Sequence, residues 1–127
     1  MISGAFRSLL IANPEIYGQV STRIYPMQAP ESAGLPLIIY QRISETTDAD
    51  LLIHSTRMQV DCYATTYDAA LQLAEDVRRA LLNRTCITDT ETILDISVVS
   101  CIDMYDAETR ISRVVTDFML LWRFNNN

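Results

Sequence analysis

The stretch Arg57–Leu82, RMQVDCYATTYDAALQLAEDVRRALL, changes from a two-residue period to a helical period. Apolar Met58, Val60 and Cys62 alternate with polar or aromatic side chains, a pattern typical of a strand with one buried face. Thr65, with an acid three residues later, favours a helix start. An apolar stripe at helical spacing then follows: Ala70, Leu73, Ala74, Val77 and Leu81. The stretch predicts a strand from about Arg57 to Ala64 and an amphipathic helix that packs on the sheet.

One more helix and four more strands are predicted on either side of this stretch. The helix runs from Ile2 to about Ala12, because Pro14 disfavours its continuation. The strands are Arg23–Tyr25, Leu37–Ile43, about Ile93–Asp103 and Arg110–Phe124. The order α-β-β-β-α-β-β predicts an α+β fold: a mostly antiparallel sheet of about five strands with two helices on one face. Residues 1–127 are expected to form one domain whose C-terminus is frayed near 125–127.

The segment between Ile43 and Arg57 is polar and acidic, and it lacks apolar alternation. It carries Glu45, Asp48 and Asp50 together with His54, which is the single histidine of the chain. These features predict a flexible connection in which the histidine is solvated.

Composition limits the classes of function. Apolar residues make up 49% and charged residues 20% of 127 residues, which is typical of one globular domain. The net charge of −6 disfavours broad attraction to nucleic acid. No apolar run reaches the roughly 20 residues needed to span a bilayer, and the N-terminus lacks the features of a signal peptide. We therefore expect no membrane association and a cytosolic setting.

No arrangement of residues points to catalysis. Cys62, Cys86 and Cys101 have no metal-site spacing, so reduced structural thiols are expected. The sequence contains no nucleophile elbow and no glycine-rich phosphate loop. The acid pairs Asp48/Asp50 and Asp103/Asp106 lack a third ligand at a defined spacing for a hard cation. The sequence predicts a protein that is not an enzyme and has no cofactor or metal site.

Two helices can cover only one face of the predicted sheet. The other face is expected to carry Ile38, Tyr40, Arg42, Arg57, Gln59, Asp61, Tyr63, Met119 and Leu121. Tyr, Arg and Met are enriched in subunit contacts, and all ten basic residues are Arg. Genomic base composition and an ordinary outer face are the alternative explanations. We predict a subunit interface that includes Tyr40, Arg42, Arg57, Tyr63 and Met119.

Three segments in succession resemble one protein family. They are RIYPMQAPESAGLPLIIYQRIS (23–44), the Arg57–Leu82 stretch, and YDAETRISRVVTDFMLLWRF (105–124). This succession resembles the tail-completion (tail-terminator, or neck) proteins of long-tailed bacteriophages and gene-transfer agents. The resemblance covers nearly the whole chain, although NRTCITDTETILD (83–95) lacks the glycines expected there.

The resemblance implies a structural role in the virion. Members form a ring, commonly hexameric, that caps the head-proximal end of the tail tube, stops tube growth and docks the head connector. The implied partners are further copies of the chain, the tail-tube protein and the connector or stopper protein. DNA would pass through the lumen without specific binding, and assembly would take place in the host cytoplasm.

The resemblance also suggests roles for two segments. The prolines of residues 26–36 remove backbone donors and stiffen the loop, so the strand at Arg23–Tyr25 is expected at the sheet edge. Glu45, Asp48 and Asp50 are expected to face the lumen or the head-facing rim, where like charge repels phosphate.

Two alternatives to tail termination stay open. The protein could be another neck, head-completion or baseplate component of a phage. It could also be a small α+β ligand-binding regulatory domain, which would require a pocket with convergent polar groups.

Overall fold

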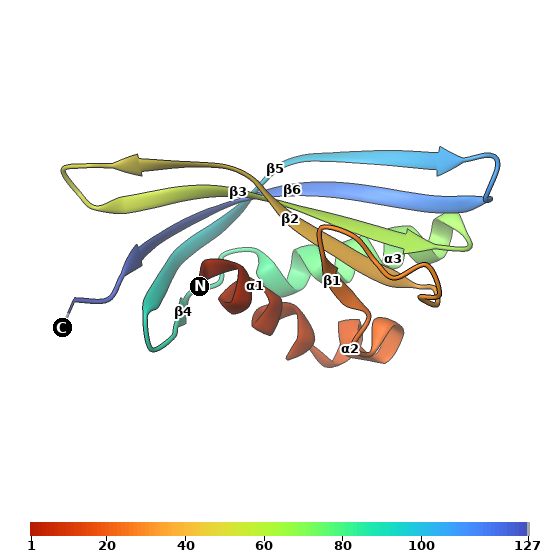
Figure 1. Cartoon of the computed structure of the whole chain (residues 1–127), viewed down its shortest axis with the longest axis horizontal. Coiled ribbons are helices and arrows are strands. Elements are labelled where there is room, and N and C mark those ends of the chain that lie inside the picture. The colour runs from red at the N-terminus through yellow and green to blue at the C-terminus, as the bar shows by residue number, and fades with distance from the viewer. Residues whose placement is uncertain (127) are drawn as a thin grey trace.

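The computed structural model of the protein describes residues 1–126. These residues form α1 (Ile2–Ile11), α2 (Pro14–Val20), β1 (Ile24–Pro26), β2 (Leu37–Asp48), β3 (Ile53–Ala64), α3 (Tyr67–Leu81), β4 (Cys86–Ile87), β5 (Glu91–Asp106) and β6 (Ile111–Phe124). The six strands make one sheet in the order β1-β2-β3-β6-β5-β4, and the helices lie on one face of it (Figure 1). The α+β class and the one-sided helical layer are as predicted. The structure adds α2 and β4, and β1 pairs with β2 in parallel.

The helix α2 begins where the sequence predicted only a helix end. The Asn13 side chain accepts hydrogen bonds from the backbone N–H groups of Glu15 and Ile16, at 3.0 and 3.1 Å. Pro14 occupies the first turn, where its missing N–H group is not needed. The same proline therefore ends α1 and starts α2, which buries Ile16 and Val20.

The short strand β1 lies at the sheet edge, as predicted. Ile38 donates its backbone N–H to the Arg23 carbonyl at 2.9 Å, and Arg23 donates from Nε to the Pro36 carbonyl at 2.9 Å. The proline-containing loop is thus attached to the chain segment that leads into β1.

The core lies between the helices and the sheet. Phe6 and Leu10 of α1 and the predicted stripe of α3 pack against β3 and β6, whose main core side chains are Met58, Val60, Val114, Phe118, Leu120 and Trp122. The ring of Phe6 lies 6.3 Å from the ring of Tyr40 and 6.5 Å from that of Phe118. The face assignments predicted for β3 and β6 are confirmed.

The face assignment predicted for β2 is wrong. Tyr40 pairs with Val60 and Ile38 with Cys62, so both side chains lie in the core and not on the outer face. The residues Leu37–Tyr40 are all apolar, so their alternation does not reveal which set faces inward. The sheet register settles the question, and Leu37 and Ile39 occupy the face without helices.

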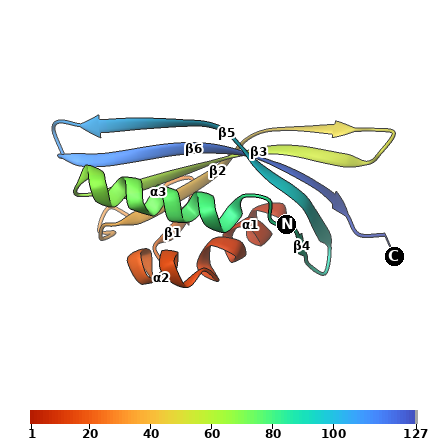
Figure 2. The same cartoon turned by 180° about the vertical axis from the view of Figure 1, so that it is seen from behind.

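The polar segment after Ile43 is a strand hairpin and not a loop. β2 and β3 stay paired out to Asp48 and Ile53, which leaves a turn at residues 49–52. This β2–β3 arm, residues 44–57, projects beyond the helices, whereas the β5–β6 hairpin turns at the opposite end of the sheet (Figures 1 and 2). The helices do not cover the outer part of the arm, so neither face of the strands is buried there. The sequence of the arm therefore does not alternate between apolar and polar residues.

β6 ends at Phe124, and the next residue, where a frayed C-terminus was predicted to begin, is still hydrogen-bonded to the fold. Asn125 donates its backbone N–H to the Thr90 carbonyl at 2.9 Å and its side-chain amide to the Thr88 carbonyl at 2.8 Å. Residue 125 is therefore attached to the fold. The part of that prediction that concerns Asn127 lies outside the described residues.

Candidate functional site

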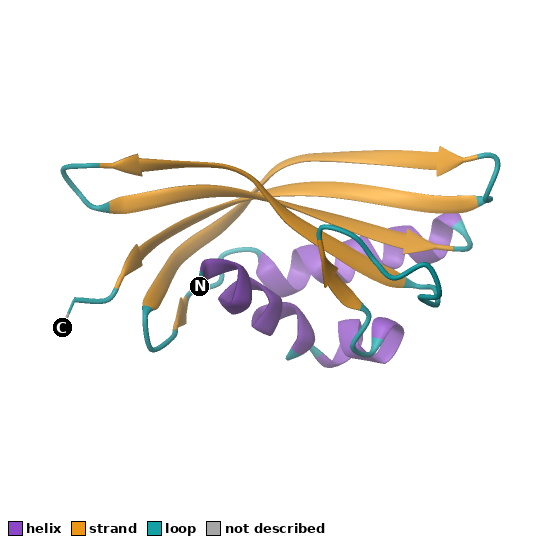
Figure 3. Ribbon diagram, viewed as in Figure 1, coloured by secondary structure: helices purple, strands orange, loops and turns teal. Residues whose placement is uncertain are grey.

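The candidate site is the sheet face that the helices leave uncovered, which Figure 3 shows above the helical layer. We call it the helix-free face. The register of the four long strands places these side chains on it: Leu37, Ile39, Gln41, Arg57, Gln59, Asp61, Tyr63, Ile102, Met104, Arg113, Val115, Asp117, Met119 and Leu121.

An ion pair joins β3 to β6 on this face. Arg57 approaches Asp117 Oδ2 with Nη2 at 2.7 Å and Nε at 2.8 Å. Gln59 donates to Asp117 Oδ1 at 3.1 Å, so both carboxylate oxygens have partners. Asp117 is only 6% exposed. Arg57, which was predicted to contact a neighbour, is therefore already paired within its own chain.

A second charge pair on this face is less well satisfied. Arg113 Nε lies 3.2 Å from Asp61 Oδ2, but the two atoms form an ion pair without a hydrogen bond. The Tyr63 hydroxyl donates to the same oxygen at 3.5 Å, and the Arg113 guanidinium lies 5.5 Å from the Tyr63 ring centre. In the described part of the chain, Asp61 Oδ1 and Arg113 Nε are buried without a hydrogen bond. Burial raises the pKa of Asp61 although Arg113 and Tyr63 lower it, and Asp117 raises it further.

Asp61→Asn should remove a pH dependence of stability. A raised pKa means that the folded state binds the Asp61 proton more tightly than the unfolded state, so the free energy of unfolding falls as pH rises through this range. The asparagine variant lacks this loss. In urea unfolding between about pH 4 and 7, the free energy of unfolding of the variant, relative to that of the wild type, should rise with pH. A relative free energy of unfolding that falls with rising pH would contradict the raised pKa of Asp61.

The structure brings together three of the five predicted contact residues. Arg57 pairs with Met119 in the sheet register, and Tyr63 lies further along β3 on the same helix-free face. Tyr40 is in the core and 5% exposed. Arg42 shares the helix-bearing face with Tyr40, but its side chain is 60% exposed.

The three acids of the β2–β3 arm do not form one free cluster. Glu45 accepts a hydrogen bond from the Thr56 hydroxyl at 2.7 Å. Asp48 Oδ1 accepts from the backbone N–H groups of Asp50 and Leu51, both at 3.0 Å, and so fixes the turn. Asp50 lies exposed in this turn.

Two leucines complete the turn of the arm. Leu51 and Leu52 are 66% and 64% exposed. Leu52 has φ of 55°, a backbone conformation that non-glycine residues seldom adopt. A strained and exposed apolar tip favours a contact with another protein.

His54 is half-buried in β3 and packs on an aromatic ring, which corrects the prediction of a solvated histidine in a flexible connection. Its ring stacks on Trp122 with centroids 4.3 Å apart, and its Nδ1 lies 2.9 Å from the Thr47 hydroxyl. The sequence did not reveal this contact because it depends on the pairing of β3 with β6, which sets His54 opposite Trp122.

The remaining features of the described residues are free thiols, two open depressions and the lengths of the helices. Cys62 is buried, and burial raises the pKa of its thiol, whereas Cys101 is exposed. No group of three metal-ligating side chains occurs within residues 1–126. Open depressions of about 460 and 540 Å³ lie beside the β5–β6 hairpin, and Met104 and Tyr105 line both. None of the helices among these residues is long and apolar enough to cross a membrane.

Two comparisons with known proteins give a match, one to a family and one to a fold. The family model described as Tail completion protein gp17 matches residues 4–123. The fold is similar to that of a chain in a solved structure described as "Virion of native gene transfer agent (GTA) particle". The identity is 12%, the TM-score is 0.75, and the match covers 94% of this chain and 92% of that chain. A comparison with curated protein sequences finds no match.

Proposed function

Since the chain belongs to the family of tail completion protein gp17, whose members are structural proteins of the phage tail, we propose that it is a tail terminator. Copies form a ring, hexameric as the resemblance implies, on the head-proximal end of the tail tube. The ring stops tube growth and provides the docking surface for the head connector. It acts in the virion without catalysis, after assembly in the host cytoplasm.

The observation that carries this proposal is the one-sided sheet with hairpin turns at its two ends. The helices add a layer to one face, and the outer circumference of a ring is longer than the inner one. The thicker, helix-bearing side therefore faces outward and the helix-free face lines the lumen. Arg57, Tyr63 and Met119 then lie on the lumen wall and not between subunits.

The charge pattern of the helix-free face suits the passage of DNA. On this face Arg57 is paired with Asp117 and Arg113 lies against Asp61, so each of these two arginines has an acid of the same chain beside it. Because an acid lies beside each of these two cations, the pair of arginines forms no free basic cluster that would bind phosphates. DNA can therefore pass without specific attachment.

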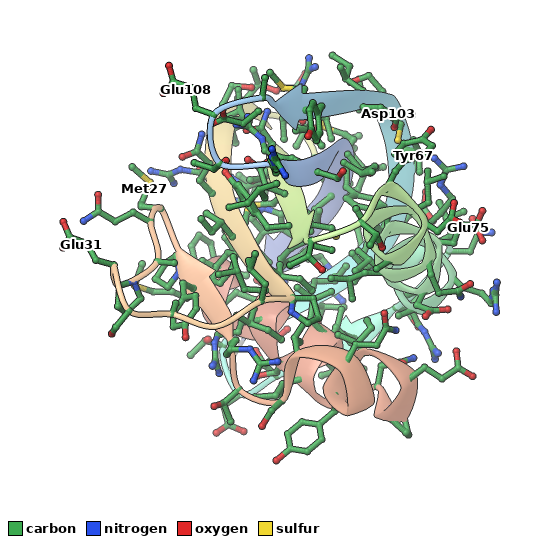
Figure 4. The ribbon with its side chains drawn as sticks, turned by 90° about the vertical axis from the view of Figure 1, so that its right-hand side faces the viewer. Met27, Glu31, Tyr67, Glu75, Asp103 and Glu108 are labelled. Atoms are coloured by element: carbon green, nitrogen blue, oxygen red, sulfur yellow. The ribbon has the colours of Figure 1, made fainter. Side chains whose placement is uncertain are left out.

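The two ends of the subunit differ in chemistry, as a joint between two different partners requires. The β2–β3 arm ends in Asp50, Leu51 and Leu52. The β5–β6 hairpin carries exposed Tyr105 and the charged turn residue Glu108 (Figure 4). We assign one rim of the ring to each end, so that Asp48 and Asp50 lie at a rim. One rim contacts the tail-tube protein and the other contacts the connector.

The test is a tube-length assay with the tail-tube protein of the same phage. Tubes are nucleated from the baseplate and polymerised with increasing amounts of this protein, and negative-stain images give their lengths. We expect tube length to fall with dose and a ring to appear at the end distal to the baseplate. Unchanged lengths at stoichiometric excess would overturn termination, and binding at the baseplate end would favour a baseplate component.

A further inference from the structure

Both outer edges of the sheet are open over long stretches. β1 covers β2 only at Ile38–Tyr40. Within residues 1–126, the remainder of β2 has no strand on its outer side. At the other edge, β4 pairs with Thr92 and Ile93, and no described strand covers the outer side of β5 beyond Ile96.

The open edges are exposed and partly apolar. Every residue of 42–48 and of 101–106 is exposed. Ile43 is 44% exposed, and Ile102, Met104 and Tyr105 are 58%, 48% and 63% exposed. An uncovered strand edge presents free N–H and C=O groups and is a template for pairing with another chain. These edges therefore form an interaction surface.

We propose that the outer edge of β2 in one subunit pairs with the outer edge of β5 in the next. This proposal rests on the ring proposed above and states how its subunits join. The two edges differ, so the contact is heterologous, and such a contact gives a closed ring when the rotation between neighbours is a whole fraction of a turn. The partner is thus a second copy of this chain.

The strand directions fit such a ring. β2 runs toward the tip of its arm, and β5 runs toward the opposite end of the sheet, so the two edges meet antiparallel (Figure 1). The unpaired part of β2 lies near the β2–β3 turn, and the unpaired part of β5 lies near the β5–β6 turn, at the opposite end of the sheet. When these two parts pair, neighbouring subunits are displaced along the strand direction. Closure of a sheet into a barrel requires this stagger, which inclines the strands to the axis.

One register satisfies both the faces and the charges. We place Arg42 opposite Asp103, since both lie on the helix-bearing face, as their partners Met58 and Val114 show. Both strands are irregular in the paired region, β2 between Arg42 and Ser44 and β5 between Val98 and Ser100. Each irregularity adds one residue to its strand, so the shift in β2 is cancelled by the shift in β5. Opposing residues then share a face in the following pairs: Ser44–Ile102, Glu45–Cys101, Thr46–Ser100, Thr47–Val98 and Asp48–Ser97.

In this register no acidic residue of β2 lies opposite an acidic residue of β5. Glu45 meets Cys101, while Asp103 meets Arg42, the one basic residue on the open edge of β2. Tyr67 donates to Asp103 Oδ2 at 2.5 Å, which leaves Oδ1 for the neighbour (Figure 4). The Arg42 contact within the chain, to Glu45 at 3.6 Å, is longer than a hydrogen bond.

The test uses the native Cys101 as one half of a cross-link. Glu45→Cys places a second thiol opposite it in the proposed register. The variant is mixed with growing tail tubes, treated with a short bismaleimide and run on a denaturing gel. We expect a ladder of covalent oligomers up to the size of the ring. Glu45→Cys combined with Cys101→Ser should give none.

The outcomes separate this inference from the proposed function. Capped tubes without a ladder would overturn the edge pairing and leave termination intact. If the wild-type protein did not cap tail tubes, the proposed termination would be overturned, and the edge pairing with it.

A charge exchange gives an independent readout of the same register. Arg42→Asp alone should raise the protein concentration for half-maximal capping by about tenfold, because it sets two acids against each other. Adding Asp103→Arg should restore capping. Equal capping by the single variant and the wild type would contradict the register.

Discussion

Replacing Phe6 with alanine is expected to lower the free energy of unfolding by about 3–5 kcal/mol. Phe6 is fully buried at the centre of the interface between α1 and the sheet. Its ring lies 6.3 Å from the Tyr40 ring on β2 and 6.5 Å from the Phe118 ring on β6. The alanine variant loses the transfer free energy of the ring and leaves a cavity that strands held by their own pairing cannot close. Urea denaturation followed by Trp122 fluorescence measures the change.

Tyr17→Ala is the matched control for the aromatic substitution. Tyr17 belongs to the neighbouring helix α2 and is 48% exposed, so its loss should change the free energy of unfolding by at most about 0.5 kcal/mol. If both variants lost the same small amount, α1 would not be packed on the sheet as described. The one-sided helical layer, and the outer ring wall built from it, would then be wrong.

Arg57→Ala is expected to lower the free energy of unfolding by about 2 kcal/mol. Removing one partner of a fully buried ion pair costs about 3–5 kcal/mol, and partial exposure reduces this. The Arg57 side chain is 36% exposed, whereas Asp117 keeps only its bond from Gln59 when the guanidinium is lost. Urea denaturation again provides the measurement.

Two further variants separate the loss of a pair from the loss of one arginine. Arg57→Met together with Asp117→Leu should recover most of the lost stability, because no uncompensated charge stays on the face. Arg78→Ala on the exposed side of α3 should leave stability within about 0.5 kcal/mol of the wild type. A double variant less stable than Arg57→Ala would show that the charges themselves hold β3 to β6.

The sequence predicted the elements whose two faces differ in chemistry. β3, β6 and α3 place apolar residues on one side only, so alternation and helical spacing identify their buried faces. β2 begins with the apolar run Leu37–Tyr40, which lacks that contrast, and its face assignment failed. The β2–β3 arm buries little, so only strand pairing, which sequence periodicity does not report, extends it to Asp48 and Ile53.

The candidate site could be predicted only in part for a related reason. Alternation along β3 and β6 grouped Arg57, Tyr63 and Met119 on one face. It did not show that Arg57 binds Asp117, a residue sixty positions away, because that contact depends on the register between two strands. An outer face rich in arginine is therefore not necessarily an adhesive one. The open backbone of the sheet edges became evident only when the extents of β1 and β4 were known.

A cryo-electron microscopy map of this protein bound to the end of a tail tube tests the arrangement most directly. We expect α1, α2 and α3 on the outer wall, the Arg57–Asp117 pair facing the lumen, and one continuous sheet in which β2 of each subunit lies beside β5 of the next. A map in which the helices line the lumen, or in which neighbours meet through the helix-free face, would contradict the proposed ring.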